Sequence, residues 1–375
     1  MKNINLLLTF LIIILINSNL FADEQDEIVY NEIVKDCVKN INDNNLPKDQ
    51  VGWCYFGAGK VFHDGREDLG VKINKQKAFY WYKKGANLGH TGAQISAANL
   101  IYFKDVKANI KNAIYWYESV IEGENPIYQD TALSMLGNIY LYGRDGVKDI
   151  DKGIKYYTKL ADNSGGFPYF VHDARNNLAF FYSDNDIIQK DLDKSLKYFK
   201  LNAENGDIVA MFLITSIYFE LEDNRQYIKW GEKLISFDFD KKSRFAKIDE
   251  TEALRNKVIV KTTMANMYMI GVPGVIQNYS KAAQYAIESA EENDSAAQYM
   301  LGYLYANGIV FKQNLIFAHM WLNIAKSGGT SINVKDIFDQ VESDLLSGQI
   351  LEAQNLALNC VKNNYKSCSD YRPLE

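Results

Sequence analysis

Thiols can attack a substrate, hold a metal ion or form disulfides. Four cysteines occur, two near each end of the chain: Cys37, Cys54, Cys360 and Cys368. No two of them form a Cys-x-x-Cys pair, which is the spacing of many zinc and redox sites. The thiol chemistry that remains is disulfide formation, with burial as free thiols as the alternative.

The histidines are also far apart in the sequence. The four histidines are His63, His90, His172 and His319, and neither a His-Glu-x-x-His motif nor any other metal spacing relates them. The sequence also lacks a P-loop. We therefore expect each histidine to be a helix-end or surface residue. We predict no catalytic residue, no cofactor-binding residue and no metal ligand.

The first residues have the pattern of an export signal. Lys2 precedes an apolar run from Leu6 to Ile16, and a polar break then leads to Ala22, a suitable last residue before cleavage. The apolar run is shorter than the about 20 residues that a membrane-spanning helix needs. Residues 1–22 are therefore predicted to be a signal peptide, with an uncleaved anchor as the alternative. No later segment is apolar enough to span a bilayer.

The charge balance of the chain bears on its partners. The chain without residues 1–22 has 40 basic and 47 acidic residues, a net charge of −7. Nucleic-acid binding calls for a basic surface, so nucleic acid is not the predicted partner. A net anionic protein is also not expected to bind anionic lipid headgroups by charge.

One short pattern recurs seven times and sets the framework of the chain. An Asp or Asn is followed four residues later by a small residue and seven residues later by an aromatic one; Tyr227 is the exception at the small position. The aromatic residues are spaced by 35, 40, 42, 32, 55 and 36 residues. The outer members of the pattern are Asn74 and Trp81, Asn109 and Trp116, Asp149 and Tyr156, Asp191 and Tyr198, Asp223 and Trp230, Asn278 and Tyr285, and Asn314 and Trp321.

The pattern has a physical reading as a capped helix. An Asp or Asn side chain accepts a hydrogen bond from a backbone N–H that the first helical turn leaves unpaired. Residues four and seven positions later fall on one face of the helix. The small residue lets a neighbouring helix approach, and the aromatic residue fills the space beside it. We interpret these aromatic residues as structural anchors of the repeat.

A second predicted helix precedes each capped helix. It places small and apolar residues at fixed spacing before an aromatic residue and often a Gly, as in Ala132, Leu136, Gly137, Tyr140 and Gly143. The Gly suits a left-handed helix C-cap. One such pair of helices cannot bury its apolar face, whereas stacked pairs can. The sequence therefore predicts an all-α fold, a right-handed α-solenoid of helix-turn-helix repeats.

These residues resemble the Sel1-like repeat family, which is tetratricopeptide-like. Its Gly-Val turn, polar cap, Lys-Ala and Trp-Tyr elements match Gly70-Val71, Asn74, Lys77-Ala78 and Trp81-Tyr82. The resemblance covers roughly residues 50–329 and implies an adaptor that recruits partner proteins.

The resemblance also frames the expected function. In exported bacterial members it implies envelope assembly, polysaccharide export or contact with a host. We therefore expect a scaffold that binds other proteins of the cell envelope or outer membrane, in the periplasm or associated with the outer envelope. One alternative is a secreted or surface-exposed factor that binds host proteins. Another is an enzyme that acts on peptidoglycan or binds β-lactams, as proposed for cysteine-rich relatives, but here no cysteine recurs at the repeat period.

The predicted organisation has four parts. After the signal peptide, residues 23–47 form an N-terminal capping helix, residues 48–329 hold seven repeats, and residues 330–375 form C-terminal capping helices and a tail. The tail from residue 363 is expected to be loose apart from Cys368. An insertion at about residues 236–250 mixes Phe with Lys and Arg. A hinge or an extra short helix is the favoured interpretation, and a partner-binding elbow is the alternative.

The four cysteines lie outside the middle of the predicted array, two near its start and two after its end. An even cysteine count in an exported chain suggests disulfides, and four cysteines allow three connectivities. Pairing of Cys37 with Cys54 and of Cys360 with Cys368 is favoured because each pair is close along the chain. Free buried thiols remain the alternative.

Overall fold

The computed structural model describes residues 24–43, 48–123, 125–163, 165–183, 189–238, 250–329 and 333–369. Within these ranges the regular structure is helical, apart from two isolated bridges that join Arg66 to Val71 and Val272 to Val275. The predicted signal peptide and most of the predicted insertion lie outside the described residues.

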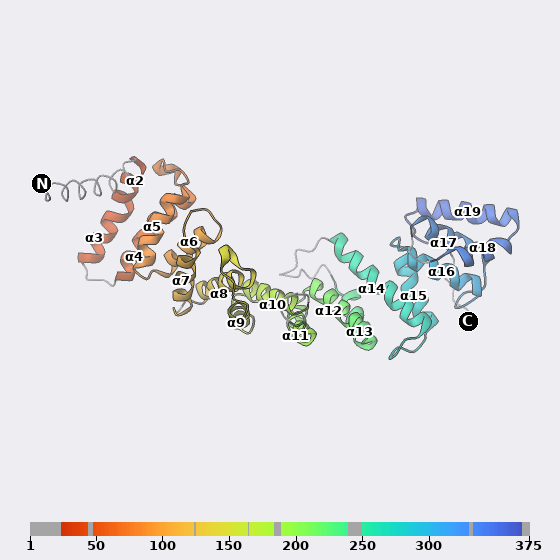
Figure 1. The fold of residues 1–375 in the computed structure, drawn as a ribbon. Coiled ribbons are helices and arrows are strands. Elements are labelled where there is room, and N and C mark those ends of the chain that lie inside the picture. The colour runs from red at the N-terminus through yellow and green to blue at the C-terminus, as the bar shows by residue number, and fades with distance from the viewer. Residues whose placement is uncertain are drawn as a thin grey trace. The chain divides into compact units, whose positions relative to one another are not determined.

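The chain divides into two compact units, residues 1–178 and 179–375, with the boundary inside one helix, α10 (Figure 1). The elements up to that boundary are α2 (Glu24–Val29), the π-helical η1 (Tyr30–Lys35), α3 (Asp36–Asp43), α4 (Lys48–Asp64), η2 (Glu67–Leu69), α5 (Lys75–Asn87), α6 (Thr91–Tyr102), α7 (Ile110–Ile121), α8 (Pro126–Tyr142), η3 (Arg144–Gly146), α9 (Ile150–Ala161) and α10 (Pro168–Ser183).

The described elements of the second unit are also helices. Its helices are α11 (Leu192–Glu204), α12 (Ile208–Glu220), α13 (Asn224–Ile235), α14 (Glu250–Ile270), α15 (Tyr279–Ala290), α16 (Ser295–Asn307), α17 (Leu315–Ser327), α18 (Lys335–Ser343) and α19 (Ser347–Lys362). Helices that follow one another in sequence pack together, as α4 does with α5, α8 with α9 and α16 with α17. The predicted all-α solenoid of helix pairs is confirmed. We call the first member of each pair helix A and the second helix B.

Each helix B begins where the Asp or Asn of the repeat pattern caps it. The Asn74 side-chain oxygen accepts from the Lys77 backbone N–H at 3.0 Å, and Asn314 accepts from the N–H of Phe317 at 3.0 Å. The other five caps accept in the same way from an N–H two or three residues on: Asn109, Asp149, Asp191, Asp223 and Asn278. These bonds satisfy donors that the first helical turn leaves open.

Stacked tyrosines join helix A to helix B in several repeats. The helix B anchor Tyr156 stacks on Tyr140 of helix A, with ring centroids 5.8 Å apart. Tyr198 stacks on Tyr182 at 6.4 Å, and Tyr285 stacks on Tyr268 at 6.2 Å. In the same three repeats a lysine three residues after the cap lies over the helix A ring. One short sequence pattern therefore fixes both the start of helix B and its contact with helix A.

Small residues allow the closest helix contacts. Ala78, Ala113 and Ala318 at the small position of the pattern have no exposed surface. At Gly153, a Cβ atom would lie 2.8 Å from the backbone nitrogen of Leu141 in α8. Tyr227, the exception to the pattern, is also buried, and burial raises its pKa to about 12. Two hydrophobic core clusters run through successive helices, one from Val29 to Tyr140 in the first unit and one from Ala265 to Cys360 in the second.

Candidate interaction surface

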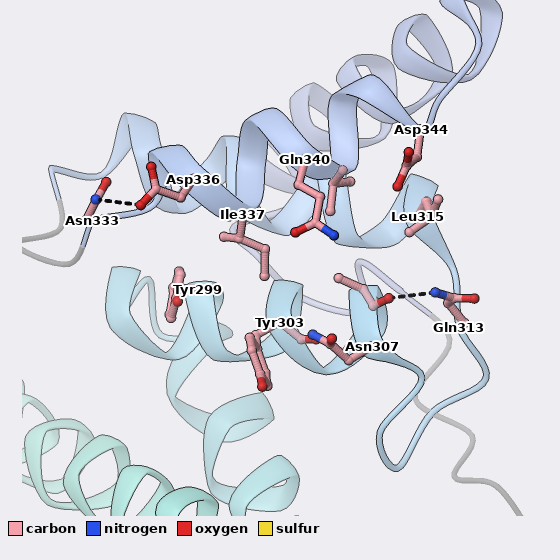
Figure 2. A pocket seen from close by; sticks show the side chains of 12 residues that line it. Tyr299, Tyr303, Asn307, Gln313, Leu315, Asn333, Asp336, Ile337, Gln340 and Asp344 are labelled. Atoms are coloured by element: carbon pink, nitrogen blue, oxygen red, sulfur yellow. Dashed lines mark hydrogen bonds between the residues drawn. The ribbon is translucent and has the colours of Figure 1, made fainter.

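A groove of about 550 Å³ lies between α16 and α18 in the second unit (Figure 2). Tyr299, Tyr303 and Asn307, spaced four residues apart along α16, form one wall. Ile337 and Gln340 of α18 stand on the opposite side. The groove exists because α18 packs against α17, which leaves part of α16 uncovered.

The groove is lined mostly by polar side chains and contains acidic but no basic residues among those described. Asp336 and Asp344 provide carboxylates, and Asp336 accepts a hydrogen bond from Asn333 at 3.2 Å. Burial raises the pKa of the Tyr299 phenol, so it remains a hydrogen-bond donor. Phenols, amides and carboxylates together can bind a polar, neutral or cationic segment of chain.

The groove position of Tyr303 has counterparts on other helices A. It stands six residues after the first small residue of its helix, Ala297. The corresponding residues are polar in five of the six other helices A, and none is buried: Lys60, Asn99, Asn138, Ser216 and Asn266. The exception is Phe180 in α10, which is apolar and 48% exposed. This recurrent polar position marks the open face of helix A. The sequence contains this polar position too, but the repeat pattern described above was built from the buried positions only.

The first disulfide ties the N-terminal helical segment to the repeats. Cys37 in α3 is bonded to Cys54 in α4, with Cα atoms 6.0 Å apart. Val29 and Val34, which precede Cys37, are buried in the same core as Phe62 of α4. The N-terminal segment thus covers the start of the array both by a covalent bond and by apolar packing.

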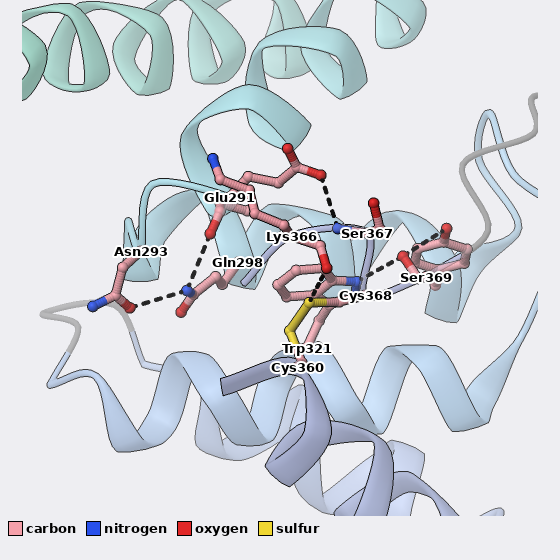
Figure 3. The surroundings of a disulfide bond; sticks show 11 residues. Glu291, Asn293, Gln298, Trp321, Cys360, Lys366, Ser367, Cys368 and Ser369 are labelled. Atoms are coloured by element: carbon pink, nitrogen blue, oxygen red, sulfur yellow. Dashed lines mark hydrogen bonds between the residues drawn. A yellow bond between two sulfur atoms is a disulfide. The ribbon is translucent and has the colours of Figure 1, made fainter. Parts of the chain in front are cut away.

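The second disulfide, between Cys360 and Cys368, closes a loop at the end of α19, with Cα atoms 5.0 Å apart (Figure 3). The residue after it, Ser369, lies within hydrogen-bond distance of two side chains of the last repeat. Its hydroxyl oxygen is 3.1 Å from the Trp321 indole nitrogen and 3.2 Å from the Tyr305 phenol oxygen. We call residues 363–369 the C-terminal latch.

The latch also makes polar contacts with the turn after α15. Lys366 forms an ion pair with Glu292 at 2.7 Å, and the Ser367 backbone N–H donates to Glu291 at 3.3 Å. The expectation of a loose tail was therefore wrong for residues 363–369. Contacts made across 48 to 76 residues of sequence hold this segment, so the local composition could not predict them.

The histidines fall into different settings. His90 caps α6 by accepting from the Ala93 N–H at 3.1 Å, and His63 at the end of α4 contacts Asp64 at 2.7 Å. His172 is half-buried in α10. His319 is only 1% exposed, so its expected place at a helix end or surface was wrong. Among the described residues no cluster of His, Cys, Asp or Glu could hold a metal ion.

The aromatic anchors fill the core between helices. Trp81, Trp116 and Tyr198 are each 4% exposed, Trp230 is 6% exposed and Trp321 is fully buried. Tyr156 and Tyr285 are half-buried in the tyrosine stacks. The structure therefore brings the anchors to packing positions and brings none of them into the groove of Figure 2.

A comparison with protein families matches these repeats directly. The Sel1 repeat model matches residues 53–90, 93–122, 131–164, 172–207, 264–294 and 295–329, which together make up more than half of the chain. The chain belongs to the Sel1 repeat family. Sel1 repeat proteins are generally protein–protein interaction scaffolds. The unmatched stretch between residues 207 and 264 contains α12 and α13, where the sequence pattern placed a further repeat.

Solved Sel1 repeat structures are similar to this chain at low sequence identity. A protective antigen of uropathogenic Escherichia coli with an SLR fold is 22% identical, with a TM-score of 0.41, 84% of this chain covered and 62% of that one. A Sel1 repeat protein from Oxalobacter formigenes is 20% identical, with a TM-score of 0.41 and coverage of 87% and 95%. A putative Sel1 repeat protein from Klebsiella pneumoniae is 16% identical, with a TM-score of 0.24, 70% of this chain covered and 99% of that one. A search of curated proteins gave no match.

Crossing a bilayer takes a helix that is both long and apolar. None of the described helices combines these two properties. The Sel1 repeats point to protein partners.

Proposed function

We propose that this Sel1 repeat protein is an exported scaffold that binds partner proteins of the bacterial cell envelope. The observation that carries the proposal is the groove between α16 and α18, where α16 presents an open polar face. Buried anchors build the array and leave this face available for a ligand. The groove of about 550 Å³ is large enough for several side chains of a partner.

Export is supported by two independent features. The first residues have the pattern of a signal peptide. Both cysteine pairs are joined as disulfides, which persist in oxidising compartments. We place the protein in the periplasm or on the outer envelope. Protease treatment of intact cells separates these locations, because a periplasmic protein is protected by the outer membrane.

The partner is sought by site-specific crosslinking in cells. A photo-reactive phenylalanine analogue replaces Tyr303 in the groove or, as a matched control, Tyr115, which is 68% exposed on α7. We expect the analogue at position 303 to capture a specific envelope protein that the analogue at 115 does not capture. Identical captures at both positions, or none, would contradict the proposed site. Recovery of the protein in the medium with an extracellular target would replace the envelope role with a secreted one.

We further infer that the protein acts by binding and not by catalysis. Sel1 repeat proteins are typically non-catalytic, which supports this inference. The sharpest enzymatic alternative is a β-lactam-binding, peptidoglycan-active protein. Labelled penicillin is expected not to attach covalently to the purified chain. Stoichiometric attachment would overturn the inference.

A further inference from the structure

A second cavity of the second unit, about 500 Å³ in volume, has a different chemical character from the groove. Arg225 and Ile228 of α13, Tyr268 of α14 and Lys281 of α15 line it, together with the turn that joins α14 to α15. The turn is held in place by the bridge between Val272 and Val275 and by the side chains of α13 that contact its carbonyls.

The cavity is lined by two cationic side chains and, among the described residues, by no carboxylate. The Arg225 Nε–H donates to the Gly274 carbonyl at 3.3 Å, which leaves its terminal nitrogens available. The Lys281 ammonium lies 5.0 Å from the centre of the Tyr268 ring and 3.4 Å from its hydroxyl. In the described part of the chain neither cation forms an ion pair. Such a cavity is unexpected in a chain whose net charge is −6.

The helix ends around the cavity add to its positive potential. Arg225 and Lys281 both stand in the first turn of their helices, where the helix dipole is positive. The carboxylate of Asp223 caps α13 by accepting from the Gln226 N–H, so it offsets part of that helix's field. The cap of α15 is the neutral Asn278, which leaves the positive end of α15 uncompensated.

Apolar surface adjoins the two cations. Ile228 lines the cavity, and Ile276 at its edge is 89% exposed. A ligand that places a carboxylate by the cations can therefore lay an apolar side chain on Ile276. An acidic peptide segment with an aliphatic residue beside its carboxylate has both groups, whereas inorganic phosphate has only the charge.

We propose that this cavity binds an acidic segment of a partner protein, in which a Glu or Asp carboxylate pairs with Arg225 and Lys281 and a neighbouring apolar side chain packs on Ile276. The proposal rests on the proposed scaffold function and gives that scaffold a second contact site with a preference for acidic chains. The groove between α16 and α18, whose only charged lining residues among those described are Asp336 and Asp344, would disfavour the same acidic segment.

The test measures binding of two labelled peptides to the purified full-length mature chain by fluorescence anisotropy. One peptide has a leucine between two glutamates, and the other has glutamines in their place. The variant is R225Q/K281Q, and the control is K229Q/K312Q, which removes two exposed lysines of the same unit outside the cavity. K281Q alone keeps the contact between Arg225 and the turn and also keeps the backbone cap at Asn278, so it separates charge loss from loosening of the turn.

We expect the glutamate peptide to bind about tenfold more tightly than the glutamine peptide, and R225Q/K281Q to remove that difference. K281Q should remove part of it, and K229Q/K312Q should bind like the wild type. Equal binding of both peptides, equal weakening by the control, or binding of inorganic phosphate with no binding of the glutamate peptide would overturn the proposal. Crosslinking at position 303 in R225Q/K281Q distinguishes the two proposals, because normal capture there leaves the scaffold function standing without the acidic-segment site.

Discussion

At the scale of single residues, His319 is a histidine buried inside the fold. It is 1% exposed on α17 and lies against Phe338 of α18, with ring centroids 4.7 Å apart. Neither ring nitrogen has a hydrogen-bond partner among the described residues. Burial lowers the pKa of His319; Glu342, 3.9 Å away, acts in the opposite direction, and Lys326 lowers it further. The imidazole is therefore neutral in the folded chain at neutral pH.

This environment predicts that stability falls in mild acid. Below about pH 6.5 the unfolded chain binds a proton on His319 that the folded chain does not, until the pH reaches the lowered folded pKa. The free energy of unfolding should fall by up to about 1.4 kcal/mol per pH unit in that window. The H319F variant keeps a ring against Phe338 and should lose this contribution. Urea unfolding of both proteins between pH 7.5 and 5.5 measures the difference, and parallel pH profiles would contradict the prediction.

A second residue-scale prediction concerns glycine in helix contacts. The G153A variant places a Cβ atom 2.8 Å from the Leu141 backbone nitrogen, so α8 and α9 must move apart. We expect a loss of about 1–3 kcal/mol in the free energy of unfolding. In G348A, the matched control, the new Cβ meets nothing within 4 Å, and its effect should lie between zero and a gain of about 1 kcal/mol. Denaturant unfolding of both variants tests the pair, and equal effects would refute the steric argument.

At the scale of elements, the two ends of the array are held by different means. The N-terminal segment inserts Val29 and Val34 into the core and adds the disulfide between Cys37 and Cys54. The C-terminal latch contacts Trp321 through Ser369 and packs only the partly buried Tyr365 and Cys368 against the core. The C-terminal latch therefore depends more on its disulfide to stay in place than the N-terminal segment does.

This difference predicts unequal consequences of removing each disulfide. In the C360S/C368S variant, residues 363–369 should lose hydrogen-exchange protection, and the free energy of unfolding should fall by about 2–3 kcal/mol. In C37S/C54S, the matched variant, apolar packing should keep the N-terminal segment protected. Hydrogen exchange with mass spectrometry measures both. An unchanged latch in C360S/C368S, or equal loss of protection at both ends, would contradict the prediction.

At the scale of the whole molecule, contacts run mainly between helices that are neighbours in sequence. Helix α5 packs on α4 and α6, and α15 packs on α14 and α16. In such arrays stability is close to a sum of repeat terms and nearest-neighbour terms. A local defect is therefore expected to stay local.

The expected readout is hydrogen exchange across the G153A variant. Amides in α8 and α9 should exchange faster than in the wild type, whereas those in α16 and α17 should stay within about twofold. G348A again serves as the control. A uniform increase in exchange along the chain would show global cooperativity and contradict the prediction.

The sequence by itself determined the Sel1 repeat fold, because its determinants are local. A cap such as Asn74 and an aromatic residue such as Trp81 act within a few turns of one helix, so their spacing can be recognised in the sequence. Tertiary structure alone decided the burial of His319, the latch contact between Ser369 and Trp321, and the meeting of Arg225 with Lys281 at one cavity. These features join residues from separate helices or distant segments. The energies of such contacts depend on distances and burial in three dimensions, which the spacing of residues along the chain does not predict.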